Sequence, residues 1–189
     1  MALEELIKFS NVIGKLKVLK RSGWISQVGI TEPESVADHS FRCAVLAMCI
    51  GDLTNVDTEK LIKMLLLHDI QEAQTGDYDH HAKREIGLSE VKFRERIAVK
   101  DVLSLLPEEL SGEYARIWQE FENRRTSEAI LAKDIDKIEM MMQALEYEKE
   151  GYDSDRLEAF WTDVQNEIRT PMIRGLFKIL KHKRRLIDK

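Results

Sequence analysis

Apolar residues recur at the spacing of an α-helix through most of the chain, and no longer repeat period separates them. The first predicted helix covers residues 2–20, and a turn region with two glycines follows at residues 21–34. The apolar positions along one side of the first helix are Leu3, Leu6, Ile7, Val12, Ile13, Leu16 and Leu19. Ser35 can cap a second helix, since Asp38, three residues later, completes a capping-box pattern. The chain therefore begins with two helices joined by a turn.

A third helix is predicted to form the buried centre of the fold. Asp57 or Thr58 caps it, and the pattern continues without a break until Gly76. Residues 64–67 are apolar all round this helix, whereas a helix at the surface carries a polar face. We therefore expect the middle of this helix to be surrounded by other elements.

The rest of the chain is predicted to be helical apart from one polar loop at residues 77–88. Pro107 ends one helix, Thr126 or Ser127 begins a long one, and Pro171 takes the favoured first position of the last one. The predicted helices cover residues 89–106, 108–123 and 127–151, with two more starting near residues 154 and 170. The pattern as a whole predicts an all-α bundle of about seven to eight helices.

The composition supports a helical globular protein. The chain has 189 residues, of which 43% are hydrophobic and 33% are charged, with nine glycines and three prolines. Few helix-breaking residues favour helices, and this apolar content is too high for a disordered chain. This length suits one compact domain, and no linker is evident, so residues 1–189 are interpreted as a single domain.

Charge and cysteine content restrict the partners and the compartment. The net charge is −5, with 34 acidic against 29 basic residues, so a long nucleic acid is not an expected partner, while a small phosphorylated ligand needs only a few local cations. No signal peptide and no run of about 20 apolar residues is present, so we expect no membrane contact. Cys43 and Cys49 are interpreted as buried free thiols in a reducing, cytoplasmic environment.

Polar groups in apolar helix interiors are the candidate functional residues. His68 and Asp69 directly follow three leucines, and a buried charge costs several kcal/mol unless it is paired or bound to a metal. A lone core histidine is usually only hydrogen-bonded, but the adjacent aspartate requires a cation. His39 lies near the start of the preceding helix, and Asp136 lies in a later apolar stretch, two residues after Asp134. Two imidazoles and two carboxylates suit a divalent transition metal, with positions left open for water or substrate.

Two further carboxylates are candidates for proton transfer. Glu72 follows His68 by four residues, so in a continuous helix it projects from the same face. Asp77 follows just after the predicted end of that helix. A carboxylate close to a metal site is what general acid/base catalysis requires, so both residues are predicted to be catalytic.

Three blocks of this sequence resemble the H…HD…D signature of the HD superfamily, and more narrowly its 5′-deoxynucleotidase branch. The blocks are ESVADHSFR (34–42), LLLHDIQEAQTGD (65–77) and AKDIDKIEM (132–140). The stretches LKRSGW (19–24) and EYE (146–148) also fit that branch. The similarity covers residues 10–165 in the same order. It implies a single HD-domain helical bundle.

The resemblance also implies the metal ligands. Carried over by position, they are His39, His68, Asp69 and Asp136. Asp134 and Asp136 compete for the last place, and the spacing to Glu139 in relatives favours Asp136. The implied cofactor is a divalent cation of the Co, Mn, Ni, Zn or Fe class. Glu72 and Asp77 are implied to act near the scissile phosphate or to hold a second cation such as Mg²⁺.

Arg21 and Trp24 match the substrate-contacting Arg and Trp of the branch. Arg suits bidentate phosphate binding, and Trp suits stacking on a nucleoside or walling it. Ser22 and Gly23 separate the pair here, whereas the pair is adjacent in bacterial relatives.

The activity that the resemblance implies is hydrolysis of (deoxy)nucleoside 5′-monophosphates to nucleoside and phosphate, by a homodimer. Two alternatives stay open. One is hydrolysis of another phosphorylated nucleotide: a triphosphate, an alarmone or a phosphodiester. The other is a non-catalytic, metal-bound helical sensor module, although such a module needs neither Glu72 nor Asp77.

Overall fold

The computed structural model describes residues 3–187 of the chain. Within that range it contains ten α-helices, one 3-10 helix and one π-helix, and its β pairing is limited to an isolated bridge between Lys20 and Ser35. The all-α prediction is confirmed, although the helices outnumber the predicted seven to eight. The difference comes from short helices that the apolar pattern merged or missed.

The helices follow one another through short connections. In chain order they are α1 (Leu3–Ile13), η1 (Gly14–Lys17), η2 (Trp24–Val28), α2 (Val36–Asp52), α3 (Thr58–Leu67), α4 (Glu72–Thr75), α5 (His80–Ile86), α6 (Leu88–Leu103), α7 (Glu108–Asn123), α8 (Ser127–Lys149), α9 (Ser154–Glu167) and α10 (Pro171–Arg184). Here η1 is the 3-10 helix and η2 is the π-helix. Among the helices described, none is long and apolar enough to cross a membrane.

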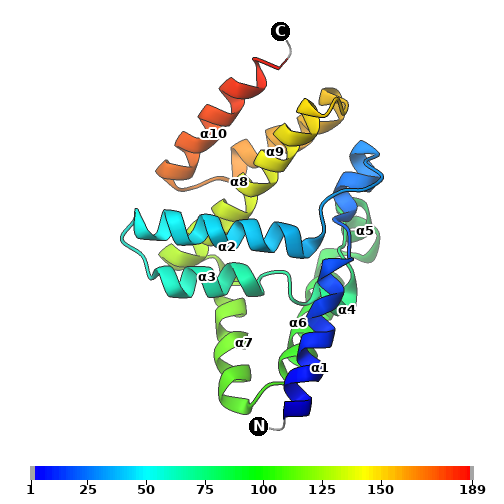
Figure 1. Cartoon of the computed structure of the whole chain (residues 1–189), viewed down its shortest axis with the longest axis vertical. Helices are drawn as coiled ribbons and strands as arrows, with labels where there is room; N and C mark the ends of the chain where they lie inside the picture. Colours follow the sequence, from blue (N-terminus) through cyan, green and yellow to red (C-terminus); the bar gives the residue numbers. More distant parts are fainter. Residues whose placement is uncertain (1–2, 188–189) are drawn as a thin grey trace.

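α8 is the helix around which most others pack. It contacts α2, α3, α7, α9 and α10, and Figure 1 shows it passing behind the antiparallel pair of α2 and α3. Large buried apolar side chains recur three or four residues apart along it, which is the spacing of one helix side, at Leu131, Ile135, Ile138 and Met141. This packing brings α2, α3 and α8, which carry the predicted metal ligands, against one another.

The predicted third helix is interrupted at its most polar point. α3 ends at Leu67, and the N–H groups of Ile70 and Glu72 then bond to carbonyls three residues before them. Bonds of this span tighten the chain before α4 begins. The expectation that residues 64–67 are buried all round was wrong, because Leu66 is 53% exposed. α3 packs on α2, α7 and α8, and its remaining side faces solvent.

The first predicted helix is also shorter than expected. α1 ends at Ile13, and the chain tightens into η1 at Gly14, a residue type with low helix propensity. α1 buries none of its side chains within this chain. Its exposed apolar residues are Leu3, Leu6 and Ile7. The predicted start at Ala2 lies outside the described residues.

Two segments predicted to lack helices contain short ones. The turn region at residues 21–34 contains η2, and the polar loop at residues 77–88 contains α5. Asp79 caps α5 by accepting a hydrogen bond from the Ala82 N–H at 2.7 Å. α5 has seven residues and buries none of them, so it lacks the apolar periodicity by which helices are predicted.

The predicted helix starts are confirmed where local chemistry sets them. Ser35 and Asp38 form the capping box of α2, and Thr126 caps α8. Asp57 caps α3, which decides between the two predicted caps, and Pro171 stands at the start of α10. These signals act within one helical turn, so sequence alone is sufficient to place them.

The two cysteines are both free, as predicted, but only one is buried. Cys43 is enclosed between α2 and the core, whereas Cys49 is exposed on the same helix. Six residues separate them, which turns the side chain by roughly 240° around the helix axis. The prediction of two buried thiols was therefore wrong for Cys49.

Candidate metal centre and active site

The four predicted metal ligands come from three packed elements. His39 lies on α2, His68 and Asp69 lie at the end of α3, and Asp136 lies on α8. The Nε2 atoms of the two histidines are 3.2 Å apart. Oδ1 of Asp136 is 3.3 Å from Nε2 of His39, and Oδ2 of Asp69 is 3.0 Å from Nε2 of His68. Two imidazoles and two carboxylates therefore converge in the interior.

Local structure explains how each histidine reaches this position. The capping box fixes the start of α2, and the His39 N–H bonds to the Ser35 carbonyl at 3.1 Å, one turn into the helix. His68 is the C-cap of α3, and Asp69 stands in the tightened turn that follows. In a straight helix adjacent side chains diverge by about 100°. The helix end allows both residues to face the same centre.

The outer nitrogen of each imidazole faces an oxygen acceptor. Nδ1 of His68 is 2.8 Å from the Leu65 carbonyl oxygen, and Nδ1 of His39 contacts Oε2 of Glu139. Acceptors at Nδ1 place the ring proton there, which leaves the Nε2 lone pairs directed at each other and at Asp136. This arrangement fits a cation.

The charges around the site also fit a cation. Burial and Arg21 lower the pKa of His39, but Cys43 and Asp136 raise it, and the pKa lies well above its ordinary value. Such surroundings stabilise positive charge at Nε2, whether it is carried by a proton or by a metal ion. His39, His68 and Asp136 each offer one ligand atom, and these atoms lie within 4.8 Å of one another.

The two aspartates remain ionised in this environment. Burial raises the pKa of Asp69, but His68 and Arg21 outweigh burial and lower it. Burial also opposes ionisation of Asp136, and its hydrogen bond with His39 lowers the pKa well below the ordinary value. Ionised carboxylates are the form that binds a divalent cation.

Asp134 and Asp136 point in different directions from α8. Oδ1 of Asp134 accepts a hydrogen bond from Arg124 at 2.8 Å, and Oδ2 accepts from the N–H groups of Arg169 and Thr170 at 2.9 and 2.6 Å. Asp134 therefore holds the connection between α9 and α10. Asp136, two residues later, faces His39 instead.

Glu72 and Asp77 have different hydrogen-bonding states. Glu72 is only 9% exposed, and its Oε2 has no hydrogen-bond partner among the described residues. Burial raises the pKa of Glu72 well above its ordinary value, Asp69 and Asp77 add to that effect, and Arg21 opposes it. Asp77 accepts hydrogen bonds from the backbone N–H and the hydroxyl of Ser22, at 2.6 and 3.0 Å. Glu72 is thus the carboxyl group with free hydrogen-bonding capacity.

Arg21 reaches the centre, whereas Trp24 does not present a free ring. Nη1 of Arg21 is 3.2 Å from Oδ2 of Asp69. Trp24 is 2% exposed, its indole N–H donates to Oε1 of Glu34 at 3.0 Å, and its ring stacks on Phe160 with centroids 4.8 Å apart. In this conformation Trp24 is not available for stacking on a nucleoside. Its contact with substrate remains a prediction.

Two acidic residues of the site were missed in the sequence. Glu139 contacts His39 and is fully buried, and Glu34 lies between Trp24 and Arg21. Glu139 left a signal, because it is a carboxylate in an apolar run three residues after Asp136, on the same helix face. Glu34 left none, because it precedes a helix in a segment interpreted as a turn.

Comparison with known proteins gives a consistent result. The family model described as HD domain matches residues 13–174. A 5′-deoxynucleotidase HDDC2 from Dictyostelium discoideum is 36% identical over 184 residues, covering 92% of this chain and 95% of the relative. The human 5′-deoxynucleotidase HDDC2 is 34% identical over 179 residues, covering 95% and 86%. Among solved structures, a conserved hypothetical protein from Pyrococcus furiosus has a TM-score of 0.77 at 33% identity, covering 95% and 99%.

The matches confirm the resemblance first inferred from the sequence blocks. The matched region contains the two histidines and the two aspartates that converge between α2, α3 and α8. An HD domain implies a divalent metal, and the donor set described above is of the kind that holds one. The chain belongs to the HD-domain family.

Proposed function

We propose that this protein is a metal-dependent 5′-deoxynucleotidase, which hydrolyses (deoxy)nucleoside 5′-monophosphates to nucleoside and phosphate. The observation that carries the proposal is the convergence of two imidazole Nε2 atoms and two carboxylates in the interior, with each Nδ1 facing an acceptor. The substrate class comes from relatives that are named 5′-deoxynucleotidases and are matched along most of their length. These relatives do not favour the other nucleotide substrates or the sensor module.

The proposed ligands of the cation are His39, His68, Asp69 and Asp136. When bound, a cation of the Co, Mn, Ni, Zn or Fe class supplies Lewis acidity, which neutralises phosphate charge and makes water more acidic. Glu72 and Asp77 lie close enough to influence each other's charge, so their alternative role, in place of proton transfer, is to hold a second cation such as Mg²⁺.

Phosphate binding and proton transfer are assigned to side chains of the protein. Arg21 binds the phosphate through its guanidinium, which is directed into the site by Asp69. Water attacks phosphorus, the bond from phosphorus to the 5′ oxygen breaks, and the leaving oxygen takes up a proton. One proton of the attacking water stays on the released phosphate, and the other replaces the proton that was donated. We assign that proton to Glu72, because its Oε2 is free, whereas Asp77 is held by Ser22. Asp77 fixes the segment that carries Arg21.

The decisive experiment is phosphate release from a panel of nucleotides. Protein stripped with EDTA is assayed on deoxy- and ribonucleoside 5′-monophosphates after addition of Co²⁺, Mn²⁺, Ni²⁺, Zn²⁺, Fe²⁺ or Mg²⁺. Deoxynucleoside monophosphates are expected to release phosphate in a metal-dependent way and faster than the ribonucleotides. Nucleoside triphosphates, an alarmone and a phosphodiester serve as comparison substrates. Faster turnover of one of these, or no release with any metal, would overturn the proposal.

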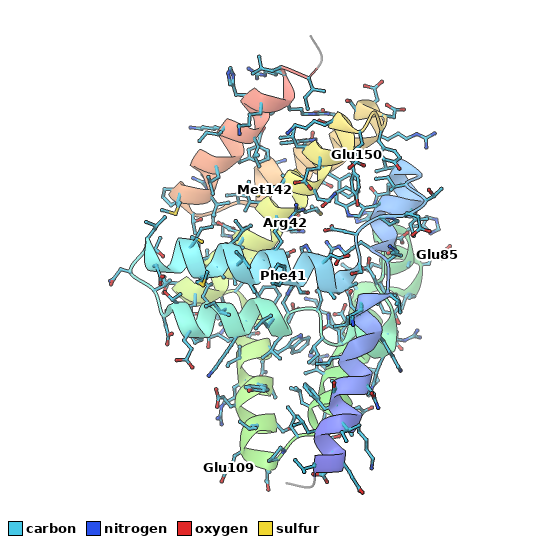
Figure 2. All side chains as sticks on the ribbon, viewed as in Figure 1. Phe41, Arg42, Glu85, Glu109, Met142 and Glu150 are labelled. Atoms are coloured by element: carbon cyan, nitrogen blue, oxygen red, sulfur yellow. The ribbon has the colours of Figure 1, made fainter. Side chains whose placement is uncertain are left out.

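We also propose that the protein is a homodimer. α2 carries exposed apolar side chains on one side, Phe41, Val45 and Met48, which are 69%, 40% and 48% exposed. Figure 2 shows Phe41 in front of α2, away from α8. A second copy of the chain can cover this face. Light scattering after gel filtration is expected to give twice the monomer mass, and Phe41→Asp is expected to reduce it to the monomer mass.

A cytoplasmic location is the last part of the proposal. Both cysteines are free thiols, which is typical of proteins in a reducing compartment. Fractionation of the source cells, with detection of the protein by antibody, tests the location.

A further inference from the structure

The buried carboxylate of Glu139 is not among the proposed metal ligands, but it contacts one of them, His39. Glu139 is fully buried on α8, three residues after Asp136. Its Oε2 contacts Nδ1 of His39, and its Oε1 accepts a hydrogen bond from Nε of Arg42 at 2.6 Å. Both oxygens of the Glu139 carboxylate are therefore occupied, one by an imidazole and one by a guanidinium.

Arg42 is itself held in place by α8. Its Nη2 donates to Gln143 at 2.7 Å, and its Nη1 donates to both carboxylate oxygens of Glu146 at 3.0 and 2.8 Å. Positions 136, 139, 143 and 146 are three or four residues apart, so they form one stripe along α8. Figure 2 shows Arg42 on the side of α2 that faces α8. One face of α8 thus carries Asp136, which is a proposed metal ligand, and Glu139, which contacts His39. The same face carries Gln143 and Glu146, which bind Arg42.

Glu139 does not serve as a further ligand of the same ion. It lies on the Nδ1 side of His39, whereas His68 and Asp136 lie on the Nε2 side. The two nitrogens of one imidazole point away from each other, so one ion cannot bind at both. His39, Cys43 and Glu139 do form a close group, but both oxygens of Glu139 already have partners. Its position is that of a group that orients a ligand.

The two histidines are oriented by different kinds of acceptor. His68 is held by the neutral backbone carbonyl of Leu65, whereas His39 is held by a carboxylate. An ionised acceptor at Nδ1 forms a stronger hydrogen bond and makes Nε2 a better electron donor. Substitution of Glu139, the acceptor at Nδ1 of His39, can therefore change the metal affinity of the site. The acceptor at Nδ1 of His68 is a backbone carbonyl of α3, which no side-chain substitution removes.

We propose that Glu139 is a positioning residue that holds His39 as the Nδ1–H tautomer with Nε2 aimed at the cation, and that Arg42 holds the Glu139 carboxylate in place. The proposal rests on the proposed metal-dependent function, since it concerns the affinity of that site. A carboxylate buried this deeply needs a cationic partner, and Arg42 supplies it through its contact with Oε1 of Glu139. Arg42 is 30% exposed through its side chain, so it links the metal site to the protein surface.

Metal affinity of the full-length protein tests the proposal without nucleotide turnover. Titration of EDTA-stripped protein with Co²⁺ in a calorimeter is expected to give a Kd about 10–100-fold weaker for Glu139→Gln than for the unchanged protein. Arg42→Gln should weaken binding as well, but less. The matched control is Glu150→Gln, an exposed carboxylate at the C-terminal end of α8 that lies outside the hydrogen bonds of Arg42 and Glu139, so its Kd is expected to stay within about twofold.

A second measurement separates positioning from a general loss of structure. The ¹⁵N chemical shifts of the imidazoles report which ring nitrogen carries the proton, and His39 is expected to change its tautomer population in Glu139→Gln while His68 does not. An unchanged Co²⁺ Kd in a folded Glu139→Gln would overturn the proposal. If that variant does not fold, an unchanged Kd in Arg42→Gln would overturn it instead. Metal binding that responds as expected, without nucleotidase activity, would refute the proposed function alone.

Discussion

The guanidinium of Arg21 donates a hydrogen bond to Oδ2 of Asp69 at 3.2 Å, although 48 residues separate them in the sequence. Asp69 also lies 3.0 Å from Nε2 of His68. One carboxylate therefore joins the residue proposed to bind phosphate to the residues proposed to bind the metal. The two functions share a group, so the phosphate and the cation are expected to meet at Asp69.

This pairing predicts how substitutions of Arg21 affect turnover. Arg21→Ala is expected to lower kcat/KM for a deoxynucleoside monophosphate by about 100-fold, or about 2.7 kcal/mol, because the phosphate loses its guanidinium partner. Arg21→Lys should recover only part of the loss, since an ammonium group cannot form the bidentate contact. Steady-state kinetics with saturating metal measure both. Lys17→Ala, an exposed cation on η1, is the control for net charge. Equal activity of Arg21→Ala and Lys17→Ala would contradict the assignment.

The two aspartates of α8 predict opposite outcomes of the same substitution. Asp136→Asn is expected to abolish high-affinity Co²⁺ binding while the fold persists, because its carboxylate faces His39. Asp134→Asn is expected to leave the Co²⁺ Kd unchanged but to lower the free energy of unfolding by about 3 kcal/mol, because a buried pair with Arg124 is broken. Calorimetric titration gives the Co²⁺ Kd of each variant, and urea denaturation gives its free energy of unfolding. The reverse pattern would assign the metal to Asp134.

This pair also shows why sequence alone could not complete the site. Ser35 and Thr126 were placed correctly because a cap acts within one turn of its helix. The residues alone left both Asp134 and Asp136 as candidate ligands, and only the resemblance favoured Asp136, because the direction of each carboxylate depends on what packs there, such as Arg124. Contacts across about a hundred residues, such as His39 with Glu139, leave no local pattern.

The helix end that was predicted wrongly, after Leu67, is also explained by contacts between distant parts of the chain. The break after Leu67 follows a run of good helix formers, so propensity predicts that the helix continues. The chain bends there because the polar pair after Leu67 faces the site between α2 and α8, a tertiary requirement that outweighs local preference. Trp24 is predicted to contact substrate because its position matches a family motif, and its burial against Phe160 is a tertiary contact that the motif does not predict.

Substitution of Glu72 is predicted to remove turnover without removing the metal. Glu72→Gln retains the size of the side chain but cannot exchange a proton, so kcat is expected to fall by about 10²–10⁴-fold. The Co²⁺ Kd should change by less than about threefold, because Glu72 is not among the proposed ligands of the primary site. Glu85→Gln, an exposed carboxylate on α5, is the matched control. Parallel losses of kcat and of Co²⁺ affinity in Glu72→Gln would mean that Glu72 binds the metal instead.

Away from the site, Glu128 predicts a pH dependence of stability. Its carboxylate lies at the start of α8 and joins it to α3: Oε1 accepts from the Asp57 N–H at 3.3 Å, and Oε2 is 3.4 Å from Nζ of Lys60. Burial raises the pKa of Glu128, but the backbone N–H groups of Glu128 and Asp57 outweigh burial, with a further contribution from Lys60, and the net shift is downward. The position at a helix N-terminus favours the same charge.

A pKa that folding lowers makes the ionised carboxylate a source of stability above the unfolded pKa of about 4.3. That contribution is lost as the pH falls through the folded pKa. Glu128→Gln is therefore expected to cost about 1 kcal/mol of unfolding free energy at pH 7, and the difference from the unchanged protein should shrink steadily below about pH 4.5. Urea denaturation between pH 3 and pH 7 measures it. Glu4→Gln is the control, because Glu4 lies in the first turn of α1 and has no described hydrogen bond to another helix. Its unfolding free energy at pH 7 should differ less from that of the unchanged protein. A cost for Glu128→Gln that is equal at both ends of the pH range would show that its carboxylate contributes by packing, because an ionic contribution cannot survive protonation.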